Sequence, residues 1–204
     1  MTNVTIIGAG NMGSAIAGIA LAGGNTVQVL ARDSDKAEVN PQVTAGTVGD
    51  AITGDVVVFA LPYPAVAEVL GAYAGQLDGK VLVDLTNPLD FATFDDLVVP
   101  ADSSAAAEFA AQVPGAHVLK ALNTNFAATL ATGSIGDATT TVLIAGDDAD
   151  AKATFASIVE GGGLTAVDAG SLKRARELES LGFLQLTLAA GEKISWTAGF
   201  ALVK

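Results

Sequence analysis

A glycine-rich segment directly after the first apolar run constrains the fold of this chain more than any other feature. Residues 4–7 have the β-branched composition of a buried strand, and the sequence GAGNMG at 8–13 follows them and opens a helical pattern over 12–22. Between a strand and a helix, such glycines allow a tight turn, the approach of a pyrophosphate to the backbone, and close helix–sheet packing. The helix start adds unpaired N–H groups and a positive dipole end, which favour phosphate. We expect a dinucleotide to contact Gly8, Gly10, Asn11, Met12 and Gly13, unless the glycines serve only as a tight turn.

Short β-branched runs alternate with alanine-rich helical stretches along the whole chain. The expected strands are 4–7, 26–30, 44–48, 55–61, 80–85, 117–122, 141–145 and 164–167, and the expected helices are 12–22, 65–74, 103–112, 147–159 and 173–190. Strands that are apolar on both faces and separated by helices are typical of a mostly parallel sheet with right-handed crossovers. We therefore predict an α/β fold with a single doubly wound Rossmann sheet over residues 1–170, and a short helical C-terminal extension of the same domain over 171–204. Residues 132–140 are expected to form a loop, and Ser103 is expected to cap the helix that it opens.

The composition excludes several classes of protein. The 204 residues carry 22 acidic and 10 basic side chains, one histidine and no cysteine, for a formal net charge of −12. Without cysteine, disulfides and cysteine-ligated metals are excluded, and with one histidine no metal site is expected. The acidic balance disfavours nucleic acid, because phosphate binding depends on clusters of Lys and Arg. No uninterrupted apolar stretch reaches membrane-spanning length and the N-terminus lacks a basic leader, so we expect a cytoplasmic protein with no membrane and no nucleic-acid partner.

The end of the second expected strand indicates which nicotinamide cofactor binds. Enzymes that use NAD usually place Asp or Glu there, about 20 residues past the glycines, to hold the ribose hydroxyls. Here Arg32 follows the strand, with Ser34 and Lys36 shortly after it, and a guanidinium pairs with a 2′-phosphate that a carboxylate would repel. We therefore predict NADP(H) with its 2′-phosphate on these three residues, the alternative being that the two cations are ordinary surface charges. An inward-pointing Asp33 or Asp35 would weaken the prediction.

The nicotinamide is expected beyond the carboxyl ends of the strands, where ligands lie in a doubly wound sheet. Three segments are placed there: Leu61-Pro62-Tyr63 after the fourth strand, Asn87 after the fifth, and Asn123 after the sixth. We expect Tyr63 to pack on the nicotinamide, and the two asparagine side chains to bind its carboxamide or the acceptor. The alternative is that Pro62 ends a strand and the asparagines cap turns.

No side chain in this region is placed to move a proton, although the reduction of a ketone needs such a group, typically His, Lys or Tyr. His117 falls at the start of its strand, the wrong end. Lys120 lies within that strand, three residues before Asn123, and is expected to be an edge residue whose ammonium reaches solvent, the alternative being that it reaches the site. Hydride transfer between two redox cofactors asks less of the protein, which need only stack the rings. The residues therefore favour a reductase of a second cofactor, with no catalytic side chain and hydride transfer achieved by positioning.

Five segments spread over nearly the whole chain carry a resemblance to a known family. They are GAGNMG at 8–13, ARDSDKAE at 31–38, ALPY at 60–63, LKALNT at 119–124 and VDAGSLKRARELESL at 167–181. These segments resemble the F-420-dependent NADP reductase family, single-domain Rossmann proteins that pass hydride between NADPH and the deazaflavin coenzyme F-420. The last segment also resembles the reductase domain of membrane ferric reductases, which hand hydride to a flavin. The resemblance implies NADP(H) on the glycine segment and an acceptor, coenzyme F-420, FMN or FAD, near Asn123, Gly199 and Phe200.

The start of the last expected helix carries the densest basic cluster, formed by Lys173, Arg174 and Arg176. We expect Arg176 to attract an anionic acceptor tail or a flavin phosphate, the alternative being ion pairs along the helix surface. Trp196 and Phe200 either line the acceptor pocket or bury a dimer contact. The leucine stripe of the helix exceeds what one sheet can cover, which favours a homodimer.

Two other functions stay open. The stretch GAGNMGSAI at 8–16 also resembles pyrroline-5-carboxylate reductase, which implies a small imine or keto substrate, although such enzymes carry a helical C-terminal domain that builds the substrate site. The other is a non-catalytic NADPH-binding module, in which no proton-moving group is needed because there is no reaction. If the protein is a reductase, whether of a second cofactor or of a small imine or keto substrate, its partner is an acceptor cofactor or a small molecule.

Overall fold

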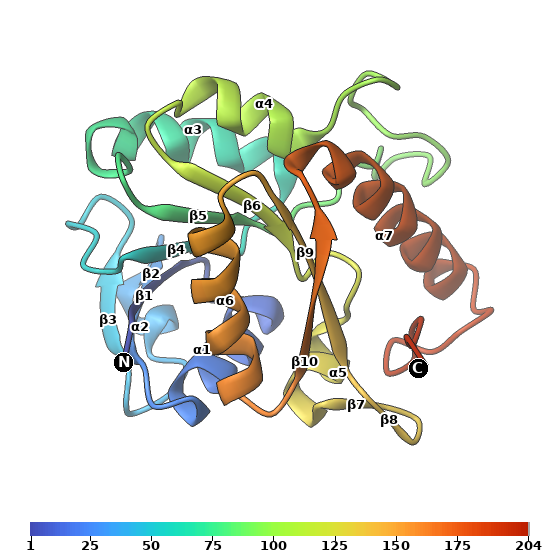
Figure 1. The fold of residues 1–204 in the computed structure, drawn as a ribbon, viewed down its shortest axis with the longest axis horizontal. Helices are drawn as coiled ribbons and strands as arrows, with labels where there is room; N and C mark the ends of the chain where they lie inside the picture. Colours follow the sequence, from blue (N-terminus) through green and yellow to red (C-terminus); the bar gives the residue numbers. More distant parts are fainter. Residues whose placement is uncertain (204) are drawn as a thin grey trace.

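Eight strands form one sheet in the computed structural model, which describes residues 1–203 (Figure 1). From one edge to the other they are β10 (Thr165–Gly170), β9 (Thr141–Gly146), β6 (His117–Ala121), β5 (Val81–Asp84), β4 (Val56–Phe59), β1 (Asn3–Ile7), β2 (Thr26–Ala31) and β3 (Thr44–Thr47). The strand order reverses between β1 and β4, so the crevice of a doubly wound fold lies there. The predicted α/β architecture is confirmed.

All neighbouring strands of the large sheet run parallel except β6 and β9, whose register pairs Leu119 with Gly146 in antiparallel fashion. The prediction of a mostly parallel sheet therefore holds, with one reversal. β10 continues parallel to β9, so the β9–α6–β10 unit is a crossover that points the other way in the sheet.

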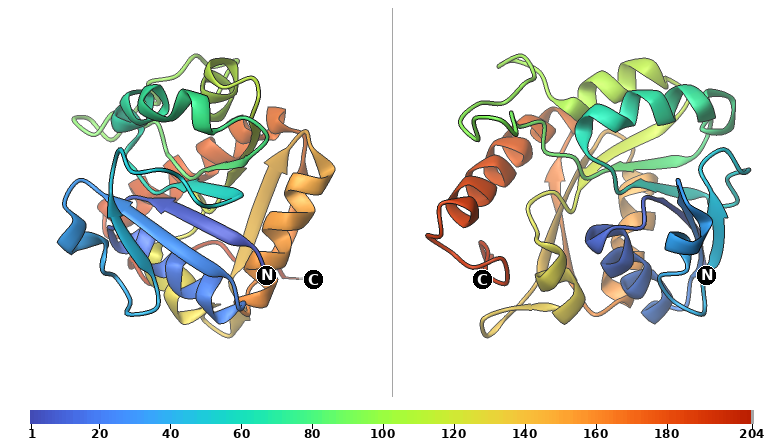
Figure 2. Two further views of the ribbon diagram at one scale, coloured as in Figure 1. Left: turned by 90° about the vertical axis from the view of Figure 1, so that its left-hand side faces the viewer. Right: turned by 180° about the vertical axis from the view of Figure 1, so that it is seen from behind.

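Helices cover both faces of the sheet (Figures 1 and 2). One face packs α1 (Asn11–Ala22) and α6 (Ala149–Gly161), and the other packs α3 (Tyr63–Tyr73) and α4 (Ala105–Gln112). Neighbouring residues of β1 show the division: Ile6 belongs to the first core and Ile7 to the second, because successive strand side chains point to opposite faces. Both residues are fully buried, which explains why the strand reads as a continuous apolar run.

The remaining helical elements are short or lie at the carboxyl ends of the strands. They are α2 (Ser34–Ala37), η1 (Ala74–Gln76), α5 (Ala127–Thr132), η2 (Leu172–Arg174) and α7 (Ala175–Ala190). Figures 1 and 2 show α7 running along the side of the molecule, with the C-terminal segment turning back beside it. None of the helices within residues 1–203 combines the length and apolar character needed to cross a bilayer.

Several predicted boundaries are wrong for local reasons. Ser104 caps α4 instead of Ser103, since its hydroxyl accepts from the N–H of Ala107 at 3.1 Å. Residues 132–140, predicted as a loop, include the antiparallel pair β7 (Ser134–Ile135) and β8 (Ala138–Thr139). The last helix begins with the tighter turn η2, so its regular part starts two residues later than predicted. The short helix α5 has too few residues to show a period and was not predicted.

Candidate nicotinamide and acceptor site

The glycine segment forms the turn between β1 and α1. Gly8 has φ of +116°, and a Cβ there would lie 2.2 Å from the carbonyl oxygen of Ala60 at the end of β4. A Cβ on Gly13 would lie 2.0 Å from the Gly8 carbonyl oxygen, so this glycine lets α1 approach the turn. Gly10 differs, because no atom beyond its own residue and its two chain neighbours lies within 4 Å of its Cβ position. Two of the glycines are therefore required by the fold, and the third leaves open space at the helix start.

The start of α1 is not capped by a side chain. Gly10 occupies the N-cap position without a side-chain hydrogen bond, and no acidic residue lies in the first turn. The first backbone N–H groups of a helix have no partner within the helix, and the helix dipole makes this end positive. The start of α1 therefore suits a phosphate group, as the sequence predicts.

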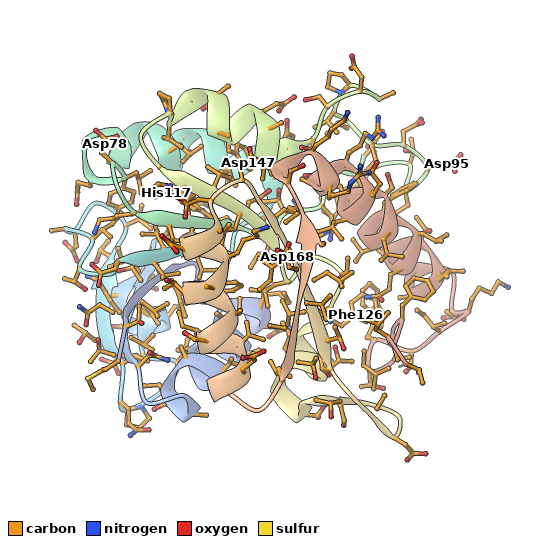
Figure 3. All side chains as sticks on the ribbon, viewed as in Figure 1. Asp78, Asp95, His117, Phe126, Asp147 and Asp168 are labelled. Carbon is orange, nitrogen blue, oxygen red and sulfur yellow. The ribbon has the colours of Figure 1, made fainter. Side chains whose placement is uncertain are left out.

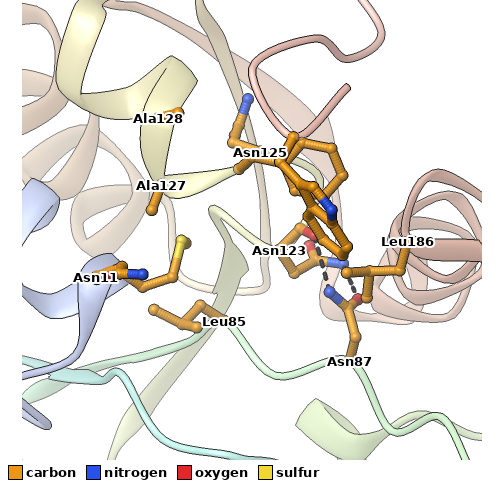
Figure 4. A pocket seen from close by; sticks show the side chains of 11 residues that line it. Asn11, Leu85, Asn87, Asn123, Asn125, Ala127, Ala128 and Leu186 are labelled. Carbon is orange, nitrogen blue, oxygen red and sulfur yellow. Dashed lines mark hydrogen bonds between the residues drawn. The ribbon is translucent and has the colours of Figure 1, made fainter. Parts of the chain in front are cut away.

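A cavity of about 420 Å³ lies next to this helix start (Figure 4). Its walls come from α1, the ends of β5 and β6, α5, α7 and the C-terminal segment. The residues that line it are Asn11, Met12, Leu85, Asn87, Asn123, Asn125, Phe126, Ala127, Ala128, Leu186 and Trp196. None of these side chains is ionisable, and the volume is typical of sites that hold small molecules.

Asparagine side chains form one wall of the cavity. Nδ2 of Asn87 donates to the backbone oxygen of Asn123 at 2.9 Å, and Nδ2 of Asn123 donates to Oδ1 of Asn87 at 2.9 Å and to the Leu178 oxygen at 2.8 Å. Leu122, just before this pair, has φ of +67°, a left-handed conformation that is strained for a branched residue. The structure thus brings together the two asparagines that the sequence predicts, at a strained turn after β6.

Three buried side-chain oxygens have no hydrogen-bond partner among residues 1–203. They are Thr86 Oγ1, Asn123 Oδ1 and Asn125 Oδ1. Leaving such an atom unpaired is costly, so unpaired atoms gathered at one place call for an explanation. Two of the three belong to residues that line the cavity.

Two aromatic side chains also line the cavity. The rings of Phe126 and Trp196 lie 5.0 Å apart, centroid to centroid, and Trp196 is half exposed. Trp196 was one of two residues for which the sequence left a pocket and a dimer contact open, and the structure places it at the pocket. Asn125 and Phe126 were not predicted; the only available signal was their position directly after Asn123.

Arg32, Ser34 and Lys36 lie together at the carboxyl end of β2, and all three are exposed. Within residues 1–203 neither cation forms an ion pair with a carboxylate. Asp33 turns toward the backbone instead, since its Oδ1 accepts from the N–H of Asp35 at 3.2 Å and caps α2. Both positive side chains are therefore exposed and outside the ion pairs of the described residues.

The segment after β4 is only partly directed at the cavity. Leu61 approaches the glycine turn, and its Cδ2 would lie 3.3 Å from a Cβ on Gly8, while Pro62 is exposed. Tyr63 packs toward α4: its hydroxyl donates to Glu108 at 2.6 Å and its ring lies 5.9 Å from that of Phe109. Burial and this hydrogen bond raise the pKa of Tyr63 to about 12, so the hydroxyl stays protonated. Tyr63 is not among the residues that line the cavity.

The expectation for Lys120 is wrong. Its strand β6 lies inside the sheet between β5 and β9, and Lys120 is fully buried instead of reaching solvent. Its ammonium lies 2.8 Å from Asp84 and 2.9 Å from Glu179. The expectation for His117 agrees with the structure: it starts β6, its Nδ1 lies 3.2 Å from Asp148, and Figure 3 shows it well apart from Phe126 at the cavity.

The predicted acceptor residues beyond Asn123 do not line the cavity. Arg176 donates to Glu177 at 2.9 Å and borders two other hollows, one shared with Asp95. The N–H of Phe200 donates to Oε1 of Gln185 on α7 at 3.1 Å, which holds Gly199 and Phe200 against that helix. Within residues 1–203 no group of three histidine or acidic side chains could hold a metal ion.

The fold and this site define the class of NADP-dependent oxidoreductases with a Rossmann sheet. Residues 3–88 match the family model described as NADP oxidoreductase, coenzyme F420-dependent. The chain belongs to this family.

The chain is similar to three individual proteins. A candidate F420-dependent NADP reductase from Arthrobacter sp. FB24 superposes with a TM-score of 0.84 at 26% identity, and the match covers 100% of both chains. Protein SMa0349 from Sinorhizobium meliloti is 31% identical with a TM-score of 0.74, and the match covers 84% of this chain and 86% of that one. Metalloreductase STEAP3 from Rattus norvegicus is 31% identical over 187 residues, which are 87% of this chain but 36% of the relative. The chain thus spans about a third of that curated relative.

Proposed function

We propose that the protein transfers hydride between NADP(H) and a planar acceptor cofactor, either the deazaflavin coenzyme F-420 or a flavin. The observation that carries the proposal is the cavity beside the start of α1, whose eleven lining residues include none that is ionisable. A carbonyl or imine substrate would call for a proton donor in that wall. Two stacked redox rings need only a flat, largely apolar space and fixed orientation.

The residues at the site fit the cofactor. The open space at Gly10 and the uncapped start of α1 suit the pyrophosphate, and Arg32 with Lys36 suits the 2′-phosphate. Asn123, whose Oδ1 lacks a partner, suits the amide N–H groups of the nicotinamide carboxamide. When bound, NADPH supplies the hydride. The chain's own contribution is to bind the phosphates, orient the carboxamide and keep water from the rings.

The acceptor ring is assigned to the space between Leu85 and the pair Phe126 and Trp196. Aromatic side chains favour offset or tilted contacts with planar rings, and the half-exposed Trp196 offers such a face. The name of one relative, a candidate F420-dependent NADP reductase, agrees with this class of acceptor.

Stopped-flow oxidation of NADPH by the purified protein tests the proposal, with coenzyme F-420, FMN and FAD as separate acceptors. We expect oxidation with at least one of them, and tighter binding of NADPH than of NADH by calorimetry. A small cyclic imine is the control substrate. Oxidation with the imine alone would indicate the pyrroline-5-carboxylate-reductase-like alternative, and NADPH binding without any oxidation would indicate a binding module.

We also propose that the protein is a homodimer joined through the outer side of α7 and the C-terminal segment. Leu184, Phe200 and Leu202 are 50%, 42% and 49% exposed there, so a second copy would remove apolar surface from water. Light scattering after size exclusion measures the mass directly. A mass of one chain at micromolar concentration would contradict the proposal, and Leu184→Glu is expected to dissociate a dimer.

A further inference from the structure

Three charged side chains meet in the interior behind the asparagine wall. Nζ of Lys120 lies 2.8 Å from Oδ2 of Asp84 and 2.9 Å from Oε1 of Glu179, and it donates to the backbone oxygen of Thr86 at 2.5 Å. The exposed fractions are 0% for the lysine side chain and 1% for each carboxylate. An ammonium has three N–H donors, and all three have partners here. Charges removed from water in this way require well-fixed partners.

Glu179 joins three parts of the fold through its one carboxylate. Besides Lys120 on β6, it accepts from the N–H groups of Ala105 at 2.9 Å and Ala106 at 3.3 Å, the first two residues of α4. The positive end of α4 and the ammonium of Lys120 thus face the same carboxylate. Since Glu179 lies on α7, this contact fixes that helix against both β6 and α4.

The charge balance singles out Glu179. Asp84 lies on β5, next to the strand that carries Lys120, so the sheet already supplies one carboxylate for one ammonium. The second carboxylate comes from the helix that walls the cavity. Asp84 alone neutralises the charge of Lys120, so the second carboxylate, Glu179, is not needed for that purpose. Its contact with Lys120 instead fixes α7.

The residue next to Glu179 contacts a side chain that lines the cavity. Leu178, directly before Glu179, offers the carbonyl oxygen that holds Nδ2 of Asn123 at 2.8 Å. One turn later, Gly182 faces the same amides, because a Cβ there would lie 2.3 Å from Oδ1 of Asn87. Leu186 lies a further turn along the helix and lines the cavity.

We propose that Glu179, paired with Lys120, is a positioning residue for hydride transfer: it sets α7 so that the Leu178 carbonyl orients the Asn123 amide and the rest of the helix places the Trp196 wall. This role rests on the proposed function. It predicts that loss of the carboxylate alters ring alignment more than cofactor binding, because the residues proposed to hold the phosphates, at the start of α1 and after β2, do not belong to α7.

The test uses Glu179→Gln, with Glu177→Gln as the matched control. Glu179→Gln leaves Lys120 paired with Asp84, so we expect the variant to fold, and circular dichroism checks this. Glu177 lies two residues earlier on α7, is exposed, and pairs only with Arg174 and Arg176, so its change removes the same charge without touching the interior.

Two readouts distinguish positioning from a general loss of structure. Trp196 is the single tryptophan of the chain, so its emission and its energy transfer to bound NADPH report on the cavity wall without any acceptor. For Glu179→Gln we expect a red-shifted emission, energy transfer reduced to about half, kcat lower by about tenfold or more, and an NADPH Kd within about threefold of the original. Glu177→Gln should leave all four unchanged.

An unchanged Trp196 signal and kcat in folded Glu179→Gln would overturn the proposal. If Glu179→Gln does not fold, Glu179→Asp replaces it: this variant keeps the charge but shortens the reach, and original values of both readouts would again overturn the proposal. If none of the three acceptors supports NADPH oxidation by the unaltered protein, the proposed function fails. The Trp196 comparison between the variants then still decides the role of Glu179.

Discussion

Asn87 and Asn123 hold each other through two hydrogen bonds of 2.9 Å, although they follow different strands and stand 36 residues apart in the chain. Nδ2 of Asn87 donates to the backbone oxygen of Asn123, and Nδ2 of Asn123 donates to Oδ1 of Asn87. Each side-chain amide is therefore held in place by the other residue. The buried Oδ1 of Asn123 has no partner among residues 1–203, so the hydrogen bonds of Nδ2 fix the direction of an unpaired acceptor in a residue that lines the cavity.

Breaking this pair is expected to slow hydride transfer more than it weakens cofactor binding. In Asn87→Ala, Nδ2 of Asn123 keeps only the Leu178 oxygen, so its amide can rotate. We expect the single-turnover rate of NADPH oxidation to fall by about tenfold to a hundredfold, because small errors in alignment are costly. Asn3→Ala, at the amino edge of the sheet, is the control and should keep its rate; an equal loss in both variants would contradict the role of the pair.

Reversing the charge at position 32 is expected to reverse the choice of cofactor. In Arg32→Glu a carboxylate would repel the 2′-phosphate, while the ribose hydroxyls of NADH would gain an acceptor. We expect KM for NADPH to rise by about tenfold or more and KM for NADH to stay equal or fall, since charged contacts to phosphate are among the strong ones. Lys193→Glu near the C-terminus is the matched control. Equal KM values for both cofactors in the unaltered protein would argue against phosphate recognition here.

Two glycines of one segment are expected to behave differently when replaced by alanine. Gly13→Ala places a methyl group 2.0 Å from a backbone oxygen, so we expect a loss of about 1–3 kcal/mol in unfolding free energy. Gly10→Ala meets no protein atom within 4 Å and has an ordinary φ of −75°, so its stability should change by about 0.5 kcal/mol or less. Its cost should appear in the NADPH Kd, about tenfold higher, because the methyl group enters the pyrophosphate space. Urea unfolding and calorimetry measure the two effects, and an unchanged Kd in Gly10→Ala would remove the cofactor from this turn.

A further pair of glycines separates helix propensity from contact. In Gly71→Ala on α3 the added methyl group meets nothing within 4 Å, so we expect a gain of about 0.5–1 kcal/mol in stability from helix propensity. Gly182→Ala on α7 has the same propensity gain but forces Oδ1 of Asn87 away from 2.3 Å. We expect no net gain in stability there and slower hydride transfer, measured by thermal unfolding and stopped flow. A gain in stability equal to that of Gly71→Ala, with an unchanged rate of hydride transfer, would show that α7 moves to accommodate the methyl group without cost.

The ion pair between Lys152 on α6 and Asp168 on the edge strand β10 predicts a pH dependence of stability. The hydrogen bond from Lys152, together with the Gly170 N–H, lowers the pKa of Asp168 below its ordinary value of 3.8. The stabilisation is therefore present above pH 3.8 and is lost as the pH falls through the lower folded-state pKa. Since Asp168 is largely exposed, we expect Asp168→Asn to cost only about 0.2–1 kcal/mol at pH 7, and less as the pH falls below 3.8. Asp137→Asn on the β7–β8 turn is the control, and a cost that does not decrease as the pH falls would mean that packing, not charge, is lost.

Local pattern determined much of the molecule in advance. The dinucleotide turn, the alternation of strands and helices, and the basic residues after β2 are visible in the sequence, because each depends on steric and periodic properties of neighbouring residues. A Cβ at Gly8 would clash with the end of another strand, which is a tertiary contact. The glycine motif nevertheless predicts a glycine at this position from the sequence alone.

Long-range pairing decided the rest. The sequence predicts Lys120 as an edge residue, whereas the strand order places β9 beside β6 and so encloses it. Burial of its charge depends on Asp84 and Glu179, which lie 36 and 59 residues away in the chain. Arg176 and Asn123 were both predicted to contact the acceptor, and the structure places Asn123 at the cavity and Arg176 at two other hollows. The sequence by itself determined which residues could bind a nucleotide, whereas the tertiary structure decided which side chains share one cavity, because side-chain direction follows from packing between elements and not from spacing along the chain.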